Sequence, residues 1–206
     1  EHRRAGHGSA VLDWILALAA DVGRTKLLTE AMWPVDETTG PGAEFVLRHG
    51  FAVDIVDAIR ALPLPPAAIP EAPVASGYSL LSWGGLAPEH RLDQYAELRR
   101  LSTEMAPSGE LGIENEYWDP ARLRHEAEQW ASQGRAAQVV AAVAPDGSLA
   151  GHTQLLFPDD QPEVYQWDTL VLPEHRGHGL GLSLKAQAMR AATDLLEGRE
   201  RLVTWN

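Results

Sequence analysis

One glycine-rich segment has the residue types and the spacing to hold a phosphate group. Arg176, Gly179 and Gly181 form the pattern R-x-x-G-x-G between a predicted strand and a predicted helix. Glycine lets the backbone approach a ligand closely and adopt positive φ angles. Amide groups at the start of a helix point outward, and the helix dipole adds about half a positive charge there. The pattern therefore predicts a pyrophosphate-binding loop, to which Arg176 adds a charge-assisted hydrogen bond.

A single R-x-x-G-x-G pattern is more often an ordinary turn than a ligand site. Here it appears twice, because Glu1 to Gly8 and Glu174 to Gly181 both read E-H-R-x-x-G-x-G. Each copy is followed by an apolar-periodic helix and a short strand, which makes chance similarity unlikely and indicates a repeated unit. The Walker pattern and the G-x-G-x-x-G dinucleotide pattern are both absent from the sequence.

The elements that position this loop follow from hydrophobic periodicity and from turn residues. The second half of the chain is predicted to hold strands at 78–83, 138–144, 149–157, 164–172 and 201–205, and helices at 88–105, 120–133 and 179–196. Asp119 is a candidate N-cap for the middle helix, and Asp146-Gly147 is a hairpin turn. This order predicts an α/β (α+β) fold with a mixed, mostly antiparallel sheet and a β-α-β crossover around the glycine loop.

The first part of the chain forms a separate block. It is predicted to hold helices at 9–22 and 38–48 and strands at 26–31 and 51–59. Five prolines between Leu62 and Val74 favour an extended, semi-rigid linker. We therefore expect 1–61 to be the C-terminal part of a first unit, 62–74 to be a linker, and 75–206 to be a second unit.

The repeat also predicts that both units are partial. The first copy begins at its glycine loop, and the second ends where the first continues, so we expect a chain that is cut at both ends. Leu202 and Val203 would then leave an apolar strand edge without a partner. We expect 1–61 to pack against 75–206, with Phe45, Phe51 and Ile55 buried at the contact.

Composition limits the classes of function. The formal net charge of −12 argues against sequence-independent binding of nucleic acid, which needs Lys and Arg. No run of apolar residues reaches the length of a membrane span, and no signal-peptide pattern opens the chain. The absence of Cys excludes thiolate metal sites and a Cys nucleophile, and it favours a cytoplasmic protein.

Residues 170–181, which read LVLPEHRGHGLG, resemble the acetyl-CoA-binding motif of GNAT-type N-acetyltransferases. The resemblance extends over 75–206 and more weakly over 1–61, as in actinobacterial tandem GNAT proteins. It implies a GNAT fold in which the strands 164–172 and 201–205 run parallel and then splay. It also implies direct transfer of an acetyl (acyl) group from acetyl-CoA to an amine of a small molecule or protein, without a metal.

The resemblance assigns roles to particular backbone groups. The strand before the loop would present its backbone to the pantetheine arm, and the loop amides would hold the pyrophosphate. The residues implied in binding acetyl-CoA are Leu170, Val171, Leu172, Arg176, Gly177, His178, Gly179, Leu180 and Gly181.

The catalytic base is expected among carboxylates near the motif strand or before the helix at 120–133. Strand alternation places Glu163 and Tyr165 on one face and Asp168 on the other. Glu114 and Glu116 precede the helix, in a region that lines the acceptor pocket in relatives. We take Glu116 and Asp168 as the candidates, although with 29 acidic residues each could equally be a surface charge. No Tyr follows Tyr165 to protonate the leaving thiolate.

Two functions from different classes remain open at this stage. The first is an acyl-CoA-dependent N-acyltransferase that contacts neither nucleic acid nor membrane, with a homodimer as one option for its assembly. The second is a non-catalytic acyl-CoA-binding or structural module, because a tandem protein can keep one degenerate unit. His175 and His178 have the spacing of a metal pair, but no third ligand accompanies them, so we expect no metal site.

Overall fold

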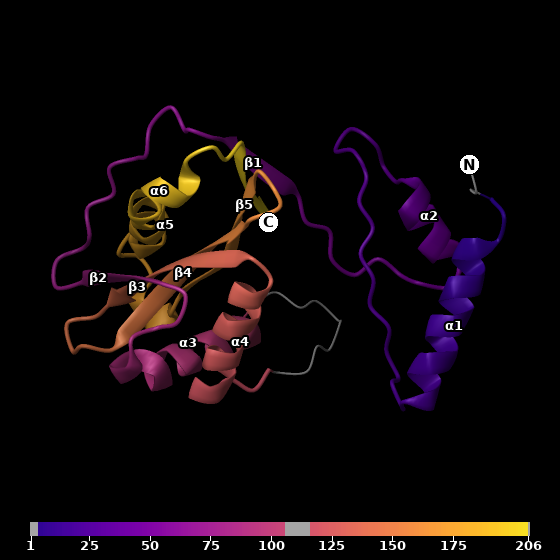
Figure 1. The fold of residues 1–206 in the computed structure, drawn as a ribbon, viewed down its shortest axis with the longest axis horizontal. Coiled ribbons are helices and arrows are strands. Elements are labelled where there is room, and N and C mark those ends of the chain that lie inside the picture. Colours follow the sequence, from indigo (N-terminus) through magenta and orange to yellow (C-terminus); the bar gives the residue numbers. More distant parts are fainter. Residues whose placement is uncertain (1–3, 106–115, 206) are drawn as a thin grey trace. The chain divides into compact units, whose positions relative to one another are not determined.

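The computed structural model describes residues 4–105 and 116–205 (Figure 1). The chain divides into two compact units between Val53 and Asp54. The boundary predicted at residue 61 is therefore wrong, because it falls inside strand β1 (Ile59–Pro63), which belongs to the second unit. None of the helices in the described ranges is long and apolar enough to cross a membrane.

The first unit consists of two helices and extended segments. Helix α1 (His7–Asp21) and helix α2 (Pro41–Arg48) touch where the ring of Phe45 lies 3.2 Å from the position that a Cβ atom of Gly8 would occupy. The strands predicted at 26–31 and 51–59 do not form. A strand needs a neighbour for its backbone hydrogen bonds, and none of the described residues of this unit provides one.

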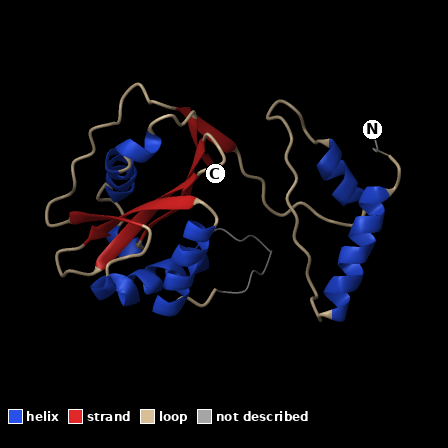
Figure 2. Ribbon diagram, in the orientation of Figure 1, coloured by secondary structure: helices blue, strands red, loops and turns tan. Residues whose placement is uncertain are grey.

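The second unit is built on one mixed sheet of six strands with the order β1-β6-β5-β4-β3-β2 (Figure 2). Neighbouring strands are antiparallel except β5 and β6, which are parallel. This arrangement confirms the predicted fold class. Besides β1, the strands are β2 (Ser79–Gly84), β3 (Arg135–Val143), β4 (Leu149–Pro158), β5 (Glu163–Val171) and β6 (Arg201–Trp205).

Helices cover both faces of this sheet, and each face has its own apolar core. Helices α3 (Leu92–Met105) and α4 (Pro120–Ser132) lie on one face, and α5 (Leu180–Ala191), followed by α6 (Thr193–Leu196), lies on the other (Figure 1). Short 3-10 turns, Glu89–Arg91 and Pro173–His175, precede α3 and the glycine loop. Asp119 caps α4 as predicted, since its carboxylate accepts a hydrogen bond from the amide of Arg122 at 2.7 Å.

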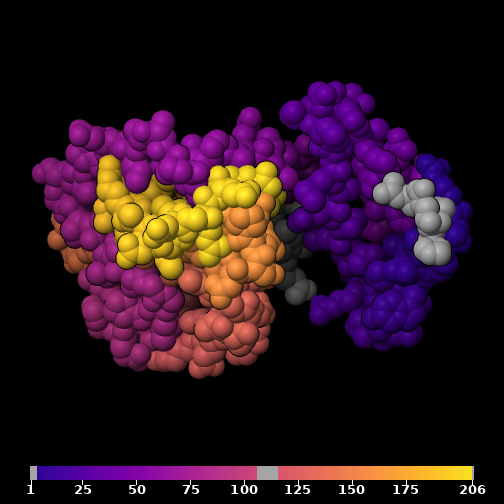
Figure 3. Space-filling view, turned by 45° about the horizontal axis from the view of Figure 1, so that its top comes forward, coloured from indigo at the N-terminus to yellow at the C-terminus, as the bar shows by residue number. Residues whose placement is uncertain are grey.

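The segment predicted as a linker is part of the second unit. Strand β1 pairs antiparallel with β6, so that Leu62 lies opposite Leu202 and covers the edge predicted to need a partner. The chain then runs along α5, and the space-filling view shows this part of the sequence, in purple, beside the C-terminal residues in yellow (Figure 3). Arg190 on α5 donates a hydrogen bond to the carbonyl of Pro70 at 2.7 Å. Residues 62–74 therefore pack on the unit that they were expected only to connect. Pro63 is tolerated because it ends an edge strand.

The two glycine loops have the same geometry where they enter their helices. Gly6 (φ 83°) and Gly179 (φ 69°) are both left-handed, and each is followed directly by the first residue of a helix. The surroundings of the helices differ, because α5 buries Leu184 completely whereas Trp14 of α1 is 65% exposed. Ile55 is 38% exposed, and its burial at a contact between 1–61 and 75–206 stays a prediction.

Candidate active site

Strands β5 and β6 separate after a short parallel ladder. They pair at only three positions among the described residues, from Glu163 opposite Arg201 to Tyr165 opposite Val203. Beyond Tyr165, β5 remains paired with β4 on its other side up to Val171. Within the part of the chain that the structure describes, the backbone of β5 from Trp167 to Val171 therefore has no strand on the side of β6. A backbone edge of this kind can accept an extended ligand as one more strand.

A β-bulge in β5 lies beside this open edge. Thr153 and Leu155 on β4 are paired with Thr169 and Gln166 on β5, so β5 holds one extra residue between the two positions. The bulge shifts the alternation of side chains, since Val164 and Val171 both pack in the core under α5. Asp168 consequently lies on the same face as Tyr165, and the prediction of opposite faces was wrong for this physical reason.

The glycine loop forms an open cradle at the start of α5. Gly177 and Gly179 have φ angles of 83° and 69°, which favour glycine, and no atom lies within 4 Å of a Cβ built at either residue or at Gly181. The Nε atom of Arg176 donates a hydrogen bond to the carbonyl of Val171 at 3.1 Å, which ties the loop to the end of β5. The residues present therefore leave space for a pyrophosphate against backbone amides.

Two cavities follow the open edge and the loop. The first, of about 260 Å³, is lined by the loop residues Arg176, Gly177, Gly179, Leu180 and Gly181. The second, of about 700 Å³, is lined by Trp167 to Val171 and by the C-terminal end of α3. Val171 and Arg176 line both, so the glycine loop and the strand edge share a border.

Two of the residues implied in cofactor binding do not line these cavities. Leu172 packs against the core on the α3 side of the sheet, and its amide donates to the carbonyl of Ala150 at 3.0 Å. The ring of His178 lies 5.2 Å from the ring of Tyr78. The Tyr78 hydroxyl is also 3.0 Å from Nδ1 of His175, so this aromatic side chain supports both histidines of the loop.

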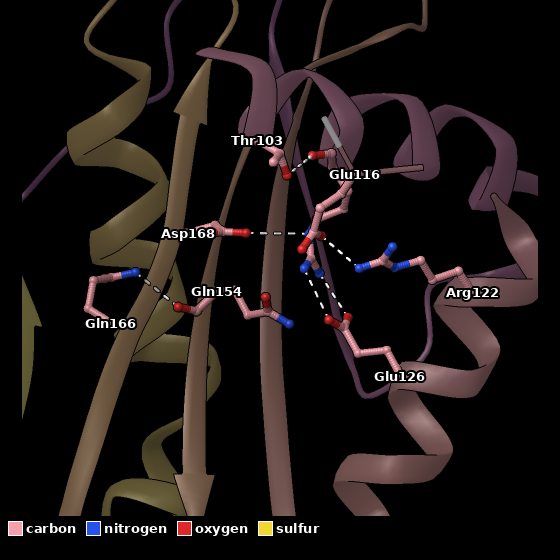
Figure 4. Close-up of polar contacts among 8 residues, drawn as sticks. Thr103, Glu116, Arg122, Glu126, Gln154, Gln166 and Asp168 are labelled. Atoms are coloured by element: carbon pink, nitrogen blue, oxygen red, sulfur yellow. Dashed lines mark hydrogen bonds and ion pairs between the residues drawn. The ribbon is translucent and has the colours of Figure 1, made fainter. Parts of the chain in front are cut away.

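Asp168 is the candidate base that the structure places in a cavity (Figure 4). Its carboxylate is about a third exposed, and Oδ2 lies 3.4 Å from Nε of Arg99 on α3. Burial raises the pKa of Asp168, the charge of Arg99 opposes this, and the nearby Glu116 adds to the increase. A carboxylate with a raised pKa is a stronger base at the mouth of the cavity.

Glu116, the second candidate, has a different environment. It is exposed and forms an ion pair with Arg122 at 2.7 Å, and the Arg122 guanidinium stacks over the ring of Trp118 at 4.3 Å. It is not among the residues that line either cavity. The negative charge of Glu116 contributes to the raised pKa of Asp168.

The other candidates are occupied elsewhere or lie outside the described residues. Glu163 pairs with Arg201 at 2.6 Å, and this contact holds the pKa of the carboxyl below its usual value, as expected of a structural ion pair. The hydroxyl of Tyr165 donates to Gln161, and its ring packs 5.8 Å from that of Trp205. Glu114 lies outside the described ranges.

Sequence reasoning missed a buried polar layer under the α3 face of the sheet. Arg99 is 4% exposed, and His152 on β4 is fully buried. Burial raises the pKa of Tyr95 to about 12 and lowers that of His152 to about 3. Among the described residues neither ring nitrogen of His152, nor the Tyr95 hydroxyl, nor Oε1 of Gln154 has a hydrogen-bond partner, and buried polar groups of this kind are commonly satisfied by ordered water.

One signal in the sequence could have found Arg99. Leu92, Tyr95 and Ala96 define the apolar face of α3, and Arg99 occupies the next position on that face. A charged residue at a core position is rare unless it is paired. No comparable signal marks His152, which lies in a strand that is buried along its whole length.

The mixed sheet, its splayed parallel strands and the glycine loop agree with the GNAT fold expected from the sequence. The family model for the acetyltransferase (GNAT) family matches residues 95–206, more than half of the chain, and the chain therefore belongs to this family. The resemblance found in the sequence is thereby confirmed.

Two solved structures resemble the model over nearly its whole length. A tandem GNAT protein from the clavulanic acid biosynthesis pathway is 27% identical, with a TM-score of 0.76 over 99% of this chain and 62% of that one. A GCN5-related N-acetyltransferase from Sphaerobacter thermophilus is 14% identical, with a TM-score of 0.62 over 100% of this chain and 60% of that one. The chain thus spans less than two thirds of either protein. No curated protein matches the sequence.

Proposed function

We propose that the second unit transfers an acyl group from a CoA thioester to an amine. The observation that supports this most directly is the open backbone edge of β5, from Trp167 to Val171, bordered by the glycine loop at one end and by Asp168 at the bulge. The loop amides would bind the pyrophosphate, and the strand edge would hold the pantetheine arm as an added strand. Acetyl-CoA is the cosubstrate expected from the family.

In this mechanism the two substrates react directly. Asp168 accepts a proton from the acceptor ammonium group, and the freed nitrogen lone pair attacks the thioester carbonyl carbon. The carbon–sulfur bond then breaks and CoA leaves as a thiolate, while the nitrogen, which became positively charged on attack, gives up a second proton. That proton balances the one that the thiolate takes up to become the free thiol. Holding both substrates in one cavity supplies the orientation that a bimolecular reaction lacks.

Glu116 has a supporting role in the same proposal. Its negative charge raises the pKa of Asp168 and adds to the attraction of a cationic amine toward the cavity. The acidic character of the whole chain acts in the same direction. The acceptor itself is defined here only as an amine.

Turnover of acetyl-CoA with a panel of amines, followed as free thiol, tests the proposal. We expect thiol release that depends on an amine and that falls at least tenfold in Asp168→Asn while CoA binding by calorimetry is retained. The exposed carboxylate of Glu128 on α4 offers a matched control, since Glu128→Gln changes the same charge away from the cavities. A protein that binds CoA but releases no thiol with any amine would instead be a non-catalytic acyl-CoA-binding module.

A further inference from the structure

Arg99 contacts three groups that belong to different parts of the chain, and two of them, the carboxylates of Glu126 and Asp168, are labelled in Figure 4. Its two Nη atoms donate to the carboxylate of Glu126 on α4 at 2.9 and 3.1 Å. Its guanidinium lies 4.0 Å from the centre of the Trp118 ring. Its Nε atom lies 3.4 Å from Oδ2 of Asp168 on β5, a longer distance than either contact with Glu126.

This geometry places one cation between two carboxylates. The paired fork with Glu126 is the stronger contact, because both hydrogen bonds are short and parallel. The Asp168 carboxylate lies on the Nε side of the guanidinium, and the rest of the Asp168 side chain lines the larger cavity. The side chain of Arg99 cannot turn away, since it is 4% exposed and packed against Trp118.

We propose that Arg99 is a positioning residue that holds the Asp168 carboxylate at the cavity, and that Glu126 compensates its charge so that Asp168 stays free to take up a proton. The inference rests on the proposed function, in which Asp168 is the base. Arg99 itself touches neither substrate. Its action is on the orientation and the charge of Asp168.

The electrostatic consequence follows from the groups that face Asp168. Arg99 and Tyr95 lie on α3, and Glu116 lies in the segment before α4. Glu126 lies on α4 and acts on Asp168 through its ion pair with Arg99. A lone arginine at this distance would hold the pKa of a carboxyl well below its usual value. The pKa of Asp168 is raised instead, because burial outweighs Arg99, and compensation of the Arg99 charge by Glu126 is consistent with this.

Two substitutions should therefore shift the pKa of the Asp168 carboxyl in opposite directions. Arg99→Met removes the cation and should raise the pKa of the Asp168 carboxyl. Glu126→Gln removes the competing carboxylate, leaves more of the Arg99 charge to Asp168, and should lower that pKa by about one pH unit. A purely structural role for the cluster would loosen the site in both variants and move the pKa in the same direction.

The measurement is a ¹³C NMR titration of the full chain labelled at aspartate carboxyl carbons, with the Asp168 signal identified by its loss in Asp168→Asn. Arg100→Met is the matched control, because this neighbour on the exposed side of α3 pairs with Glu97 and Glu104 and should leave the signal unchanged. If Arg99→Met does not fold, the direction of the Asp168 pKa shift in Glu126→Gln alone decides between the positioning role and a purely structural one.

The proposal is overturned if the Asp168 midpoint stays in place, or if Glu126→Gln raises it. The titration needs no turnover, so it separates this inference from the proposed function. An Asp168→Asn protein with full thiol release would remove Asp168 as the base, while opposite shifts would still show that Arg99 and Glu126 set its charge. In an active protein the low-pH limb of kcat/KM should shift in the same directions.

Discussion

Gly151 on β4 and Leu170 on β5 approach so closely that a Cβ atom on Gly151 would lie 2.4 Å from the Leu170 carbonyl oxygen. The same atom would lie 3.0 Å from Cα of Val171. Leu170 and Val171 form the end of the open strand edge that lines the larger cavity. The absence of a side chain at position 151 thus allows β5 to sit where its backbone borders the candidate site.

We predict that Gly151→Ala lowers the free energy of unfolding by about 1–3 kcal/mol, because the backbone of β5 must move to admit the methyl group. Urea denaturation of both proteins measures this difference. Gly84→Ala on β2 is the control, since a Cβ atom at position 84 would lie 3.6 Å from the Ala137 carbonyl oxygen, an ordinary contact distance. Equal stabilities of the two variants would contradict the close approach.

A second prediction concerns the glycine loop. Gly179→Asp should abolish CoA binding, because it brings a negative charge into a cradle for pyrophosphate, and calorimetry should show a loss of at least about 100-fold in affinity. Gly198→Asp separates charge from backbone strain, since Gly198 has a similar φ of 74° and equally open surroundings. It should destabilise the fold by a similar amount and still bind CoA. Unchanged affinity in Gly179→Asp would remove this loop from the site.

A third prediction concerns the strand that protects the sheet edge. A chain of residues 54–206 keeps β1, whereas a chain of 64–206 leaves β6 without its antiparallel partner and exposes the backbone of Leu202 and Val203. An unpaired apolar edge promotes association. Size-exclusion chromatography with light scattering should show larger species only for 64–206. The same single species for both chains would contradict a protective role for β1.

A fourth prediction follows from His152. Burial, with a smaller contribution from Arg99, lowers its pKa to about 3 from an ordinary value of 6.5, so the ring is neutral in the folded protein at pH 5 whereas the unfolded chain binds a proton. The stability contributed by the neutral ring is therefore complete above pH 6.5 and is lost as pH falls toward 3. This one group should reduce the free energy of unfolding by about 2 kcal/mol between pH 7 and pH 5.

His152→Leu should remove that contribution to the pH dependence. Urea denaturation at pH 7 and at pH 5 gives, for each protein, the difference in the free energy of unfolding between the two pH values. The wild-type chain should lose about 2 kcal/mol more than the variant between these pH values. An identical loss in both proteins would mean that the imidazole is not held neutral in the fold.

Local sequence patterns predicted most of the second unit correctly. The strand at β2, the hairpin of β3 and β4, and helices α3 to α5 lie within a few residues of their predicted bounds, because apolar periodicity and capping residues act over a few neighbouring positions. The glycine loop was predicted for the same reason. Its two left-handed glycines are a property of the local chain.

Predictions failed where a strand needed a distant partner. The segments predicted as strands at 26–31 and 51–59 have apolar residues suited to strands. Without a neighbouring strand, 26–31 and 51–58 form no regular structure, and only Ile59 enters a strand, as the first residue of β1. The proline-rich segment was predicted to be a linker, yet its first two residues, Leu62 and Pro63, pair with β6 and form the end of β1. Strand pairing depends on contacts between residues far apart in sequence, which a local pattern does not contain.

The sequence by itself determined the glycine loop, the strand–helix crossover around it and the family to which they point, since each depends on residue types at fixed short spacing. Only the tertiary structure decided which carboxylate borders the cavity. The bulge in β5 turns Asp168 to the face where Arg99 of α3, which is itself paired with Glu126 of α4, forms an ion pair with it. A one-residue shift in strand register and contacts between separate elements set that position, and both arise from packing of the whole sheet.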